Sequence, residues 1–231
     1  MHRLLRILST ALITAGVVIL ADVAMTLAWK EPVSTVYGSI KQGEAEDELA
    51  ELEDRFPSAA DLRAVERAAD VRERAGLLAD LFEQRAGTGE GIGRIEIPGI
   101  DLDVVFVEGT DTTSLQKGPG HYPETAFPGQ GRTVAIAGHR TTYLAPFRKI
   151  NEIDDGDEVV LEMPYATFTY RVQKHEIVEP TRVQIVRDVG YERLVLTACH
   201  PLYSAAQRWA VFAKLERISF FAAGDGIWQD P

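Results

Sequence analysis

The chain has 231 residues, of which 45% are hydrophobic, and its mean hydropathy is −0.08. This length and composition leave room for one well-buried domain of ordinary size plus an appendage. The formal net charge is −11 at pH 7, and no basic face is recognisable, so the sequence excludes a nucleic-acid-binding protein of the usual basic kind.

The first predicted element is an apolar segment close to the N-terminus. Residues 7–29 carry one charge, at Asp22, and as a helix of ~1.5 Å per residue they span roughly 34 Å, enough to cross a ~30 Å hydrocarbon core. Two arginines precede the segment, whereas Lys30 is followed at once by Glu31. The positive-inside rule therefore predicts a single-pass membrane anchor in residues 1–30, with a cytoplasmic N-terminus and the rest of the chain outside the cell. A cleaved signal peptide is the alternative, although its apolar core usually has only ~7–15 residues.

Residues 31–91 are predicted to form a helical stalk or linker. Apolar residues recur at helical spacing among charges in residues 44–85, and Pro57 divides this region into two helices. Ser58 and Asp61 have the spacing of a capping box at the start of the second helix. The stalk either lies against the following domain or lifts it from the membrane. A glycine-rich hinge closes it at residues 87–91.

From residue 92 the hydrophobic pattern changes to the two-residue period of β-strands. Turn sequences separate seven predicted strands, at residues 92–97, 102–109, 132–138, 158–163, 168–178, 193–199 and 209–215. Seven or eight short strands with little helix predict a mainly β domain over residues 92–218, either a closed β-barrel or a sandwich. Residues 219–231 are predicted to be a disordered C-terminal tail.

Cys199 is the only cysteine in the chain, and it ends the predicted strand 193–199. An exported chain with one cysteine cannot form an internal disulfide, so the thiol is free. A free thiol in an oxidising compartment risks oxidation, which favours a functional role over that of a small buried side chain. Alternation along the strand places Thr197 and Cys199 on the face opposite the core and points the adjacent His200 away from the thiol.

Two more side chains complete a candidate site for acyl transfer. Antiparallel pairing of the last two predicted strands brings Arg208 roughly opposite Cys199. His139 ends an apolar strand and is the best candidate base, because the other four histidines precede the membrane, lie in mid-strand, fall in a loop or point away. A thiol, an imidazole and a guanidinium suit nucleophilic catalysis by a thiolate, with no metal or organic cofactor. Zinc binding by Cys199 and His200 is disfavoured, because no second pair has metal-ligand spacing.

Three motifs occur together in a characteristic order: Gly-His-Arg-Thr-Thr-Tyr at 138–143, Leu-Thr-Ala-Cys-His-Pro at 196–201 and Ser-Ala-Ala-Gln-Arg at 204–208. With these motifs, residues 92–218 resemble the sortases, and the His-Arg-Thr-Thr-Tyr and Cys-His-Pro details most resemble the class E sortases of actinobacteria. The resemblance implies an eight-stranded sortase-type β-barrel. It also implies a membrane-anchored cysteine transpeptidase that cleaves a C-terminal sorting signal between Thr and Gly through a thioacyl intermediate.

The same resemblance implies roles for individual residues. Cys199 is then the nucleophile, His139 the general acid and base, and Arg208 the group that binds substrate and stabilises the oxyanion, while Thr197 helps to position the substrate. Class E resemblance implies a preference for Leu-Ala-x-Thr-Gly over Leu-Pro-x-Thr-Gly signals. Tyr122 is our hypothesis for a contact to the second signal position, and a loop tyrosine that packs on the barrel rim is the alternative. The implied partners are surface proteins that bear sorting signals and an acceptor amine on a peptidoglycan precursor.

Two other functions stay open at this point. One is a pilin-polymerising sortase with a lysine acceptor, although no obvious lid segment is present unless residues 44–90 serve as one. The other is a non-catalytic, membrane-anchored β binding module in which the thiol is incidental.

Overall fold

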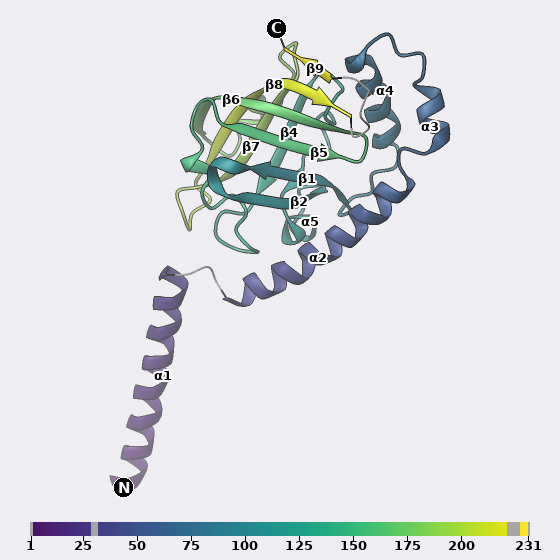
Figure 1. Cartoon of the computed structure of the whole chain (residues 1–231). Helices are drawn as coiled ribbons and strands as arrows, with labels where there is room; N and C mark the ends of the chain where they lie inside the picture. Colours follow the sequence, from purple (N-terminus) through teal and green to yellow (C-terminus); the bar gives the residue numbers. More distant parts are fainter. Residues whose placement is uncertain (1, 29–31, 221–226, 231) are drawn as a thin grey trace.

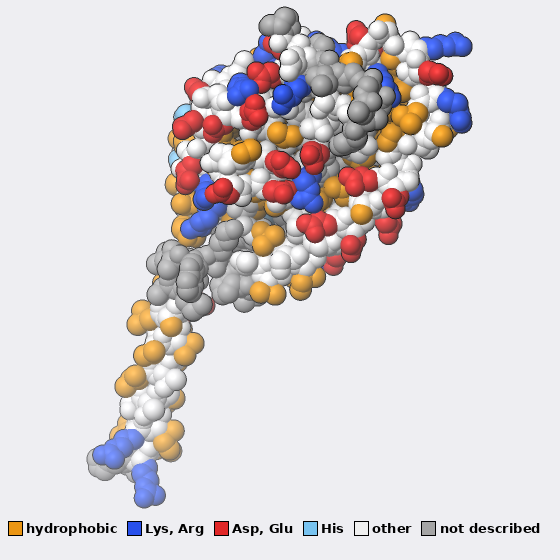
Figure 2. Space-filling view, in the orientation of Figure 1, with side chains coloured by type: hydrophobic (Ala, Val, Ile, Leu, Met, Phe, Trp, Pro, Cys, Tyr) orange, Lys and Arg blue, Asp and Glu red, His pale blue; other side chains and the backbone are white. Residues whose placement is uncertain are grey.

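The computed structural model describes residues 2–28, 32–220 and 227–230. Helix α1, His2–Ala28, contains a stretch, Arg3–Val23, that is long and apolar enough to cross a membrane and is unburied. It stands apart from the rest of the molecule (Figure 1), with a largely hydrophobic surface and basic side chains at its N-terminal end (Figure 2). The helix thus suits a membrane anchor or a signal sequence, and its orientation stays a prediction. Trp29, Lys30 and Glu31, which entered that prediction, lie outside the described residues.

Eight strands form a closed, mixed β-barrel, as predicted. The strand order is β6-β5-β1-β2-β3-β4-β7-β8, and pairing between β6 and β8 closes the ring. The pairs β2–β3 and β4–β7 are parallel, and the other pairs are antiparallel. The strands are β1 Gly91–Ile97, β2 Leu102–Glu108, β3 Gly120–His121, β4 Thr133–Gly138, β5 Glu158–Met163, β6 Ala166–Val178, β7 Arg193–His200 and β8 Gln207–Ser219.

All seven predicted strands are present, and the differences lie at their ends and in the shortest elements. Strand β3 was not predicted, because two residues cannot show a period. Strand β9, Ile227–Gln229, pairs with the end of β8, Ser219 is the last residue of β8, and Phe220 packs against the core, so the prediction of disorder is wrong for these residues. The end of β8 supplies hydrogen-bonding partners for the backbone of β9. The local sequence of residues 227–229 does not reveal this pairing. Residues 221–226 and 231 of the predicted tail lie outside the described part of the chain.

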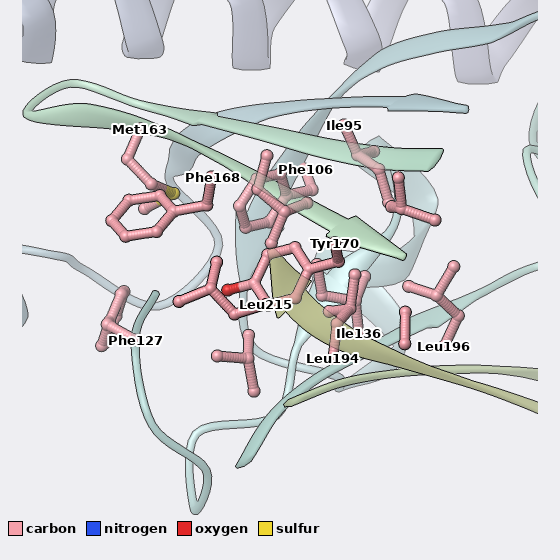
Figure 3. Close-up of a cluster of buried hydrophobic side chains, with 14 of the residues drawn as sticks. Ile95, Phe106, Phe127, Ile136, Met163, Phe168, Tyr170, Leu194, Leu196 and Leu215 are labelled. Carbon is pink, nitrogen blue, oxygen red and sulfur yellow. The ribbon is translucent and has the colours of Figure 1, made fainter. Parts of the chain in front are cut away.

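The barrel interior is filled by large apolar side chains that alternate along the strands (Figure 3). On β7, Leu194, Leu196 and Ala198 point into this core, whereas Val195 belongs to a smaller cluster on the opposite face. This alternation was predicted, and it leaves Thr197 and Cys199 on the face away from the core.

Three helices, α2 Pro32–Arg55, α3 Ala59–Ala64 and α4 Val71–Glu83, precede the barrel, where two were predicted. The predicted capping box is confirmed, since Ser58 Oγ accepts from the Asp61 N–H and the Asp61 carboxylate accepts from the Ser58 N–H. Phe56 and Phe82 pack at 5.3 Å between ring centroids and share one hydrophobic core with the barrel. Of the two arrangements left open by the sequence, the helices therefore adopt the one against the barrel.

Helix α2 runs along β1 and β2 (Figure 1). Its residues Ala45 and Leu49 form a buried cluster with two valines of β2. Glu48 accepts hydrogen bonds from Lys117 Nζ, at 2.6 Å, and from the Gly91 N–H, at 3.1 Å. Lys117 ends the short helix α5, Thr112–Lys117. The predicted hinge at 87–91 is also tied to β2, through two backbone hydrogen bonds with Glu108.

Candidate active site

Cys199 and Arg208 face each other across the β7–β8 hairpin. They are direct partners in the antiparallel register, as predicted, so their side chains lie on the same face of the sheet. The Cys199 thiol is free and half-buried. The Arg208 guanidinium donates hydrogen bonds to the carbonyls of Ala205, at 2.9 Å, and Gln207, at 3.0 Å. Carbonyls of the loop between the two strands and of its flanking residue therefore hold the guanidinium of the residue that pairs with Cys199.

His139 follows β4, which runs parallel to β7 and beside it. The last paired residues of the two strands are Gly138 and Ala198, so His139 and Cys199 occupy equivalent positions at the carboxyl ends of adjacent parallel strands. Gly138 is required there, because a Cβ would lie 2.4 Å from the ring of Phe147, whose N–H bonds back to the His139 carbonyl. The chain after β4 thus folds back so that Phe147 packs on Gly138 and is hydrogen-bonded to His139.

Burial governs the protonation of His139. Its Nε2 atom is buried and has no hydrogen-bond partner among the described residues, and burial lowers the pKa of the imidazole below its usual 6.5. The lowered pKa favours the neutral imidazole, which is the form able to accept a proton from a thiol or an amine.

Arg140, which no sequence pattern singled out, joins the two strand ends. Its side chain is only 5% exposed, and its Nη1 donates to the Cys199 carbonyl, at 3.3 Å, and to Nδ1 of His200, at 3.2 Å. Nη2 donates to the Asn151 side-chain oxygen, and the guanidinium lies 6.0 Å from the centre of the Trp209 ring. This buried cation therefore fixes the backbone that carries the candidate nucleophile. Arg140 follows His139 in the sequence, but nothing local indicates that it is buried.

The two residues proposed for substrate positioning meet on the outer face of the barrel. The hydroxyls of Tyr122 and Thr197 are hydrogen-bonded at 2.9 Å, although they are 75 positions apart. Tyr122 also packs against a cluster formed by Ala135, Val195, Ala210 and Phe212. Tyr122 thus packs on the outer face of the barrel, and its contact to the second signal position stays a prediction.

His121, His175 and His200 make other contacts. His121 is 1% exposed, with Nδ1 2.7 Å from Glu108 Oε2 and Nε2 3.0 Å from the Ala126 carbonyl oxygen. His175 stacks on Trp209 at 5.1 Å, and His200 packs against the same ring at 5.4 Å. Among the residues that the structure describes, no group of three or more His, Cys, Asp or Glu side chains could hold a metal ion.

Comparison with known proteins adds evidence from sequence. A profile of the sortase domain matches residues 95–216. Sortase D of Bacillus subtilis is 35% identical over 131 residues, which cover 55% of this chain and 65% of that protein. SrtE1 of Streptomyces coelicolor is 31% identical over 143 residues, covering 55% of this chain and 41% of that protein. The chain thus spans less than two thirds of the length of these two relatives.

Solved structures give a matching result for the fold. Sortase E from Streptomyces avermitilis superposes with a TM-score of 0.54 at 33% identity, over 60% of this chain and 98% of that one. Sortase E1 from Streptomyces coelicolor, solved with a tripeptide in its active site, gives 0.56 at 27% identity, over 61% and 98%. A sortase D5 transpeptidase of Clostridium perfringens gives 0.60 over 75% and 98%, and at 23% identity this likeness concerns the fold alone.

Proposed function

This chain belongs to the sortase family, and we propose that it is a cysteine transpeptidase that cleaves C-terminal sorting signals between Thr and Gly. The observation that carries the proposal is the register around Cys199, which has Arg208 as its direct partner on β8 and His139 at the end of the parallel neighbour β4. These three groups supply a nucleophile, a proton carrier and a fixed cation, as acyl transfer requires.

In the first half-reaction, the neutral imidazole of His139 accepts the thiol proton of Cys199, and the thiolate attacks the carbonyl carbon of the signal threonine. The guanidinium of Arg208 stabilises the negative charge that develops on the carbonyl oxygen. Collapse of this intermediate breaks the bond between Thr and Gly, and the imidazolium of His139 gives its proton to the departing glycine amine. A thioester at Cys199 is left.

In the second half-reaction, an acceptor amine attacks the thioester carbon. His139 takes a proton from the amine nitrogen, the carbon–sulfur bond breaks, and the sulfur regains its proton from the imidazolium. The products are a new amide and the free thiol, so the cycle balances without a cofactor. The acceptor in this proposal is the amine of a peptidoglycan precursor, and the protein substrates are surface proteins with sorting signals.

The substrate preference is a finer part of the proposal. We infer a class E type preference for Leu-Ala-x-Thr-Gly signals, with Tyr122 contacting the second position and Thr197 helping to position the peptide. Its support is the pairing of Tyr122 with Thr197 on the Cys199 face of β7, together with the class E relatives. Sortase D of Bacillus subtilis matches this chain at higher identity than SrtE1 does, 35% against 31%, so the class E preference has to be tested by comparing the two signal peptides.

The proposed location follows from α1. As a single-pass anchor with a cytoplasmic N-terminus, it would keep the barrel outside the cell and close to the membrane, where both precursor and acceptor are found.

The test uses the full-length protein in detergent, with Leu-Ala-x-Thr-Gly and Leu-Pro-x-Thr-Gly peptides and either a glycine-based amine or a lysine-bearing peptide as acceptor. Mass spectrometry should show a product cut between Thr and Gly and joined to the glycine-based amine, and the Cys199→Ala variant should show none. Joining only to lysine would replace this proposal by the pilin-type activity. A wild type that forms neither a product nor a thioester with any peptide would overturn it.

A further inference from the structure

The chain takes an unusual path directly after His139. Three consecutive residues, Tyr143, Leu144 and Ala145, have positive φ angles of 49°, 65° and 47°. Residues other than glycine rarely adopt this left-handed region, and they do so where the surrounding structure holds them. Residues 143–145, which follow the candidate acid and base His139, are therefore held in a conformation that local sequence does not favour.

Helix α2 lies against this segment. Gly38 of α2 is buried, and a Cβ at this position would lie 3.0 Å from both the Cα and the carbonyl carbon of Tyr143 and 3.1 Å from the Leu144 nitrogen. Glycine at residue 38 permits this close approach, because a Cβ would require the facing backbone to shift by a few tenths of an ångström. The N-terminal part of α2 thus packs directly on the backbone of the left-handed segment at Tyr143 and Leu144.

Side chains extend the same contact. The rings of Tyr37 and Tyr143 meet edge to face at 6.1 Å between centroids. The Tyr37 hydroxyl donates to Oε1 of Gln116 in α5, and Nε2 of Gln116 donates to the Tyr143 hydroxyl, both at 3.4 Å. Tyr143 is therefore held by α2 on its backbone and ring, and by α5 on its hydroxyl.

Tyr143 in turn covers His139. The imidazole and the phenol ring lie 5.1 Å apart at an angle of 44°. Because His139 Nε2 is buried without a hydrogen bond to the described residues, ring packing takes the place of the hydrogen bond that commonly orients a catalytic imidazole.

We propose that Tyr143 is a positioning residue for His139 and that α2, the helix that follows the membrane segment, holds Tyr143 in place through Tyr37 and Gly38. The proposal rests on the proposed function in assigning proton transfer to His139. Helix α2 would then contribute to the orientation of the active-site imidazole. Displacing the first turns of α2 should disturb proton transfer while leaving the thiol and the contact between Tyr122 and Thr197 intact.

The first test is a matched pair of glycine replacements in α2, made in the full-length protein in detergent. Gly38→Leu forces a side chain into the backbone of Tyr143, whereas Gly43→Leu makes the same change in the same helix at a position with nothing within 4 Å. Both variants gain helix propensity, so they differ in the contact alone. Gly38→Leu should lower kcat at least about tenfold with KM changed less than about threefold, because small misplacements of reacting groups are costly. Gly43→Leu should match the wild type.

The second test removes the ring. Tyr143→Phe keeps the packing on His139 and should retain most of kcat. Tyr143→Ala removes this packing and should lower kcat to a similar extent as Gly38→Leu. Titration of the His139 imidazole by nuclear magnetic resonance gives an independent readout. Loss of the covering ring should move its pKa upward towards 6.5 in Tyr143→Ala and in Gly38→Leu, but not in Tyr143→Phe or Gly43→Leu.

The outcomes separate the two proposals. If the wild type cleaves signal peptides and both disruptive variants keep its kcat and its His139 titration, the positioning role is wrong. If the wild type cleaves nothing, the proposed function fails, and the titration alone decides whether α2 and Tyr143 control the imidazole. Equal loss of kcat in Gly38→Leu and Gly43→Leu would also overturn the proposal, since it would point to a general effect on α2.

Discussion

The hydroxyl groups of Tyr122 and Thr197 lie 2.9 Å apart and connect the loop after β3 to the middle of β7. Thr197 precedes Cys199 by two residues on the same face of the strand, so this hydrogen bond holds the Tyr122 ring close to the thiol. A peptide whose threonine carbonyl reaches Cys199 would pass near this pair.

The first prediction concerns signal preference. Tyr122→Phe removes the hydroxyl and keeps the ring, and it should reduce the ratio of kcat/KM for Leu-Ala-x-Thr-Gly over Leu-Pro-x-Thr-Gly by about 2–10-fold, as expected for one hydrogen bond of ~0.5–1.5 kcal/mol. Thr197→Val should have the same effect, and the double variant should lose no more than either single one. Steady-state kinetics with both peptides measures this, and an unchanged ratio in Tyr122→Phe rejects the contact.

A second prediction concerns Arg140. Arg140→Lys keeps the charge but cannot serve the Cys199 carbonyl, His200 and Asn151 together. These part-buried acceptors would lose a charged donor, so the free energy of unfolding should fall by about 1–3 kcal/mol and kcat should fall as the Cys199 backbone loosens. Urea unfolding and peptide cleavage measure the two effects. Arg132→Lys, at a side chain that is 53% exposed, is the control and should change neither.

The third prediction concerns pH. Because burial lowers the pKa of His139, the unfolded chain takes up a proton at this residue before the folded chain does. The wild type should therefore lose stability as the pH falls from about 6.5 towards the folded-state pKa, with no such effect above that window. His139→Gln should remove this loss, so its unfolding free energy relative to the wild type should rise between pH 7.5 and pH 5.5. A relative fall would mean that the folded protein favours the imidazolium.

A fourth prediction tests the packing of α2 against strand β1 of the barrel. A Cβ at Gly91 would lie 2.1 Å from the Ala45 carbonyl oxygen, so Gly91→Ala must push α2 away from β1. Overpacking of this kind costs about 1–3 kcal/mol, which urea unfolding can measure. Gly43→Ala, in open space on the same helix, is the control and should leave stability equal or slightly higher.

The strands and the register of Cys199 with Arg208 were predictable because they depend on short-range rules. Alternation along β7 separated the core residues from Thr197 and Cys199, and the length of one hairpin placed Arg208 opposite the thiol. His139 could be chosen by eliminating the other histidines. The first two inferences used residues within one strand or one turn, where the period of the backbone decides which way a side chain points. The place of His139 beside Cys199 depends instead on the parallel pairing of β4 and β7.

The contacts that complete the site lie beyond such rules. Three contacts join segments that are distant in sequence. They are the hydrogen bond from Arg140 to the Cys199 carbonyl, the hydrogen bond between Tyr122 and Thr197, and the close packing of Gly38 on the backbone of Tyr143. Their partners meet only once the barrel has closed through β6 and β8 and α2 has packed on β1 and β2. Composition and periodicity therefore indicated a mainly β domain, either a barrel or a sandwich, and selected Cys199, Arg208 and His139 as candidate site residues. The orientation of those groups depends on long-range packing, because side-chain burial and backbone approach arise from the assembled core rather than from neighbours in the chain.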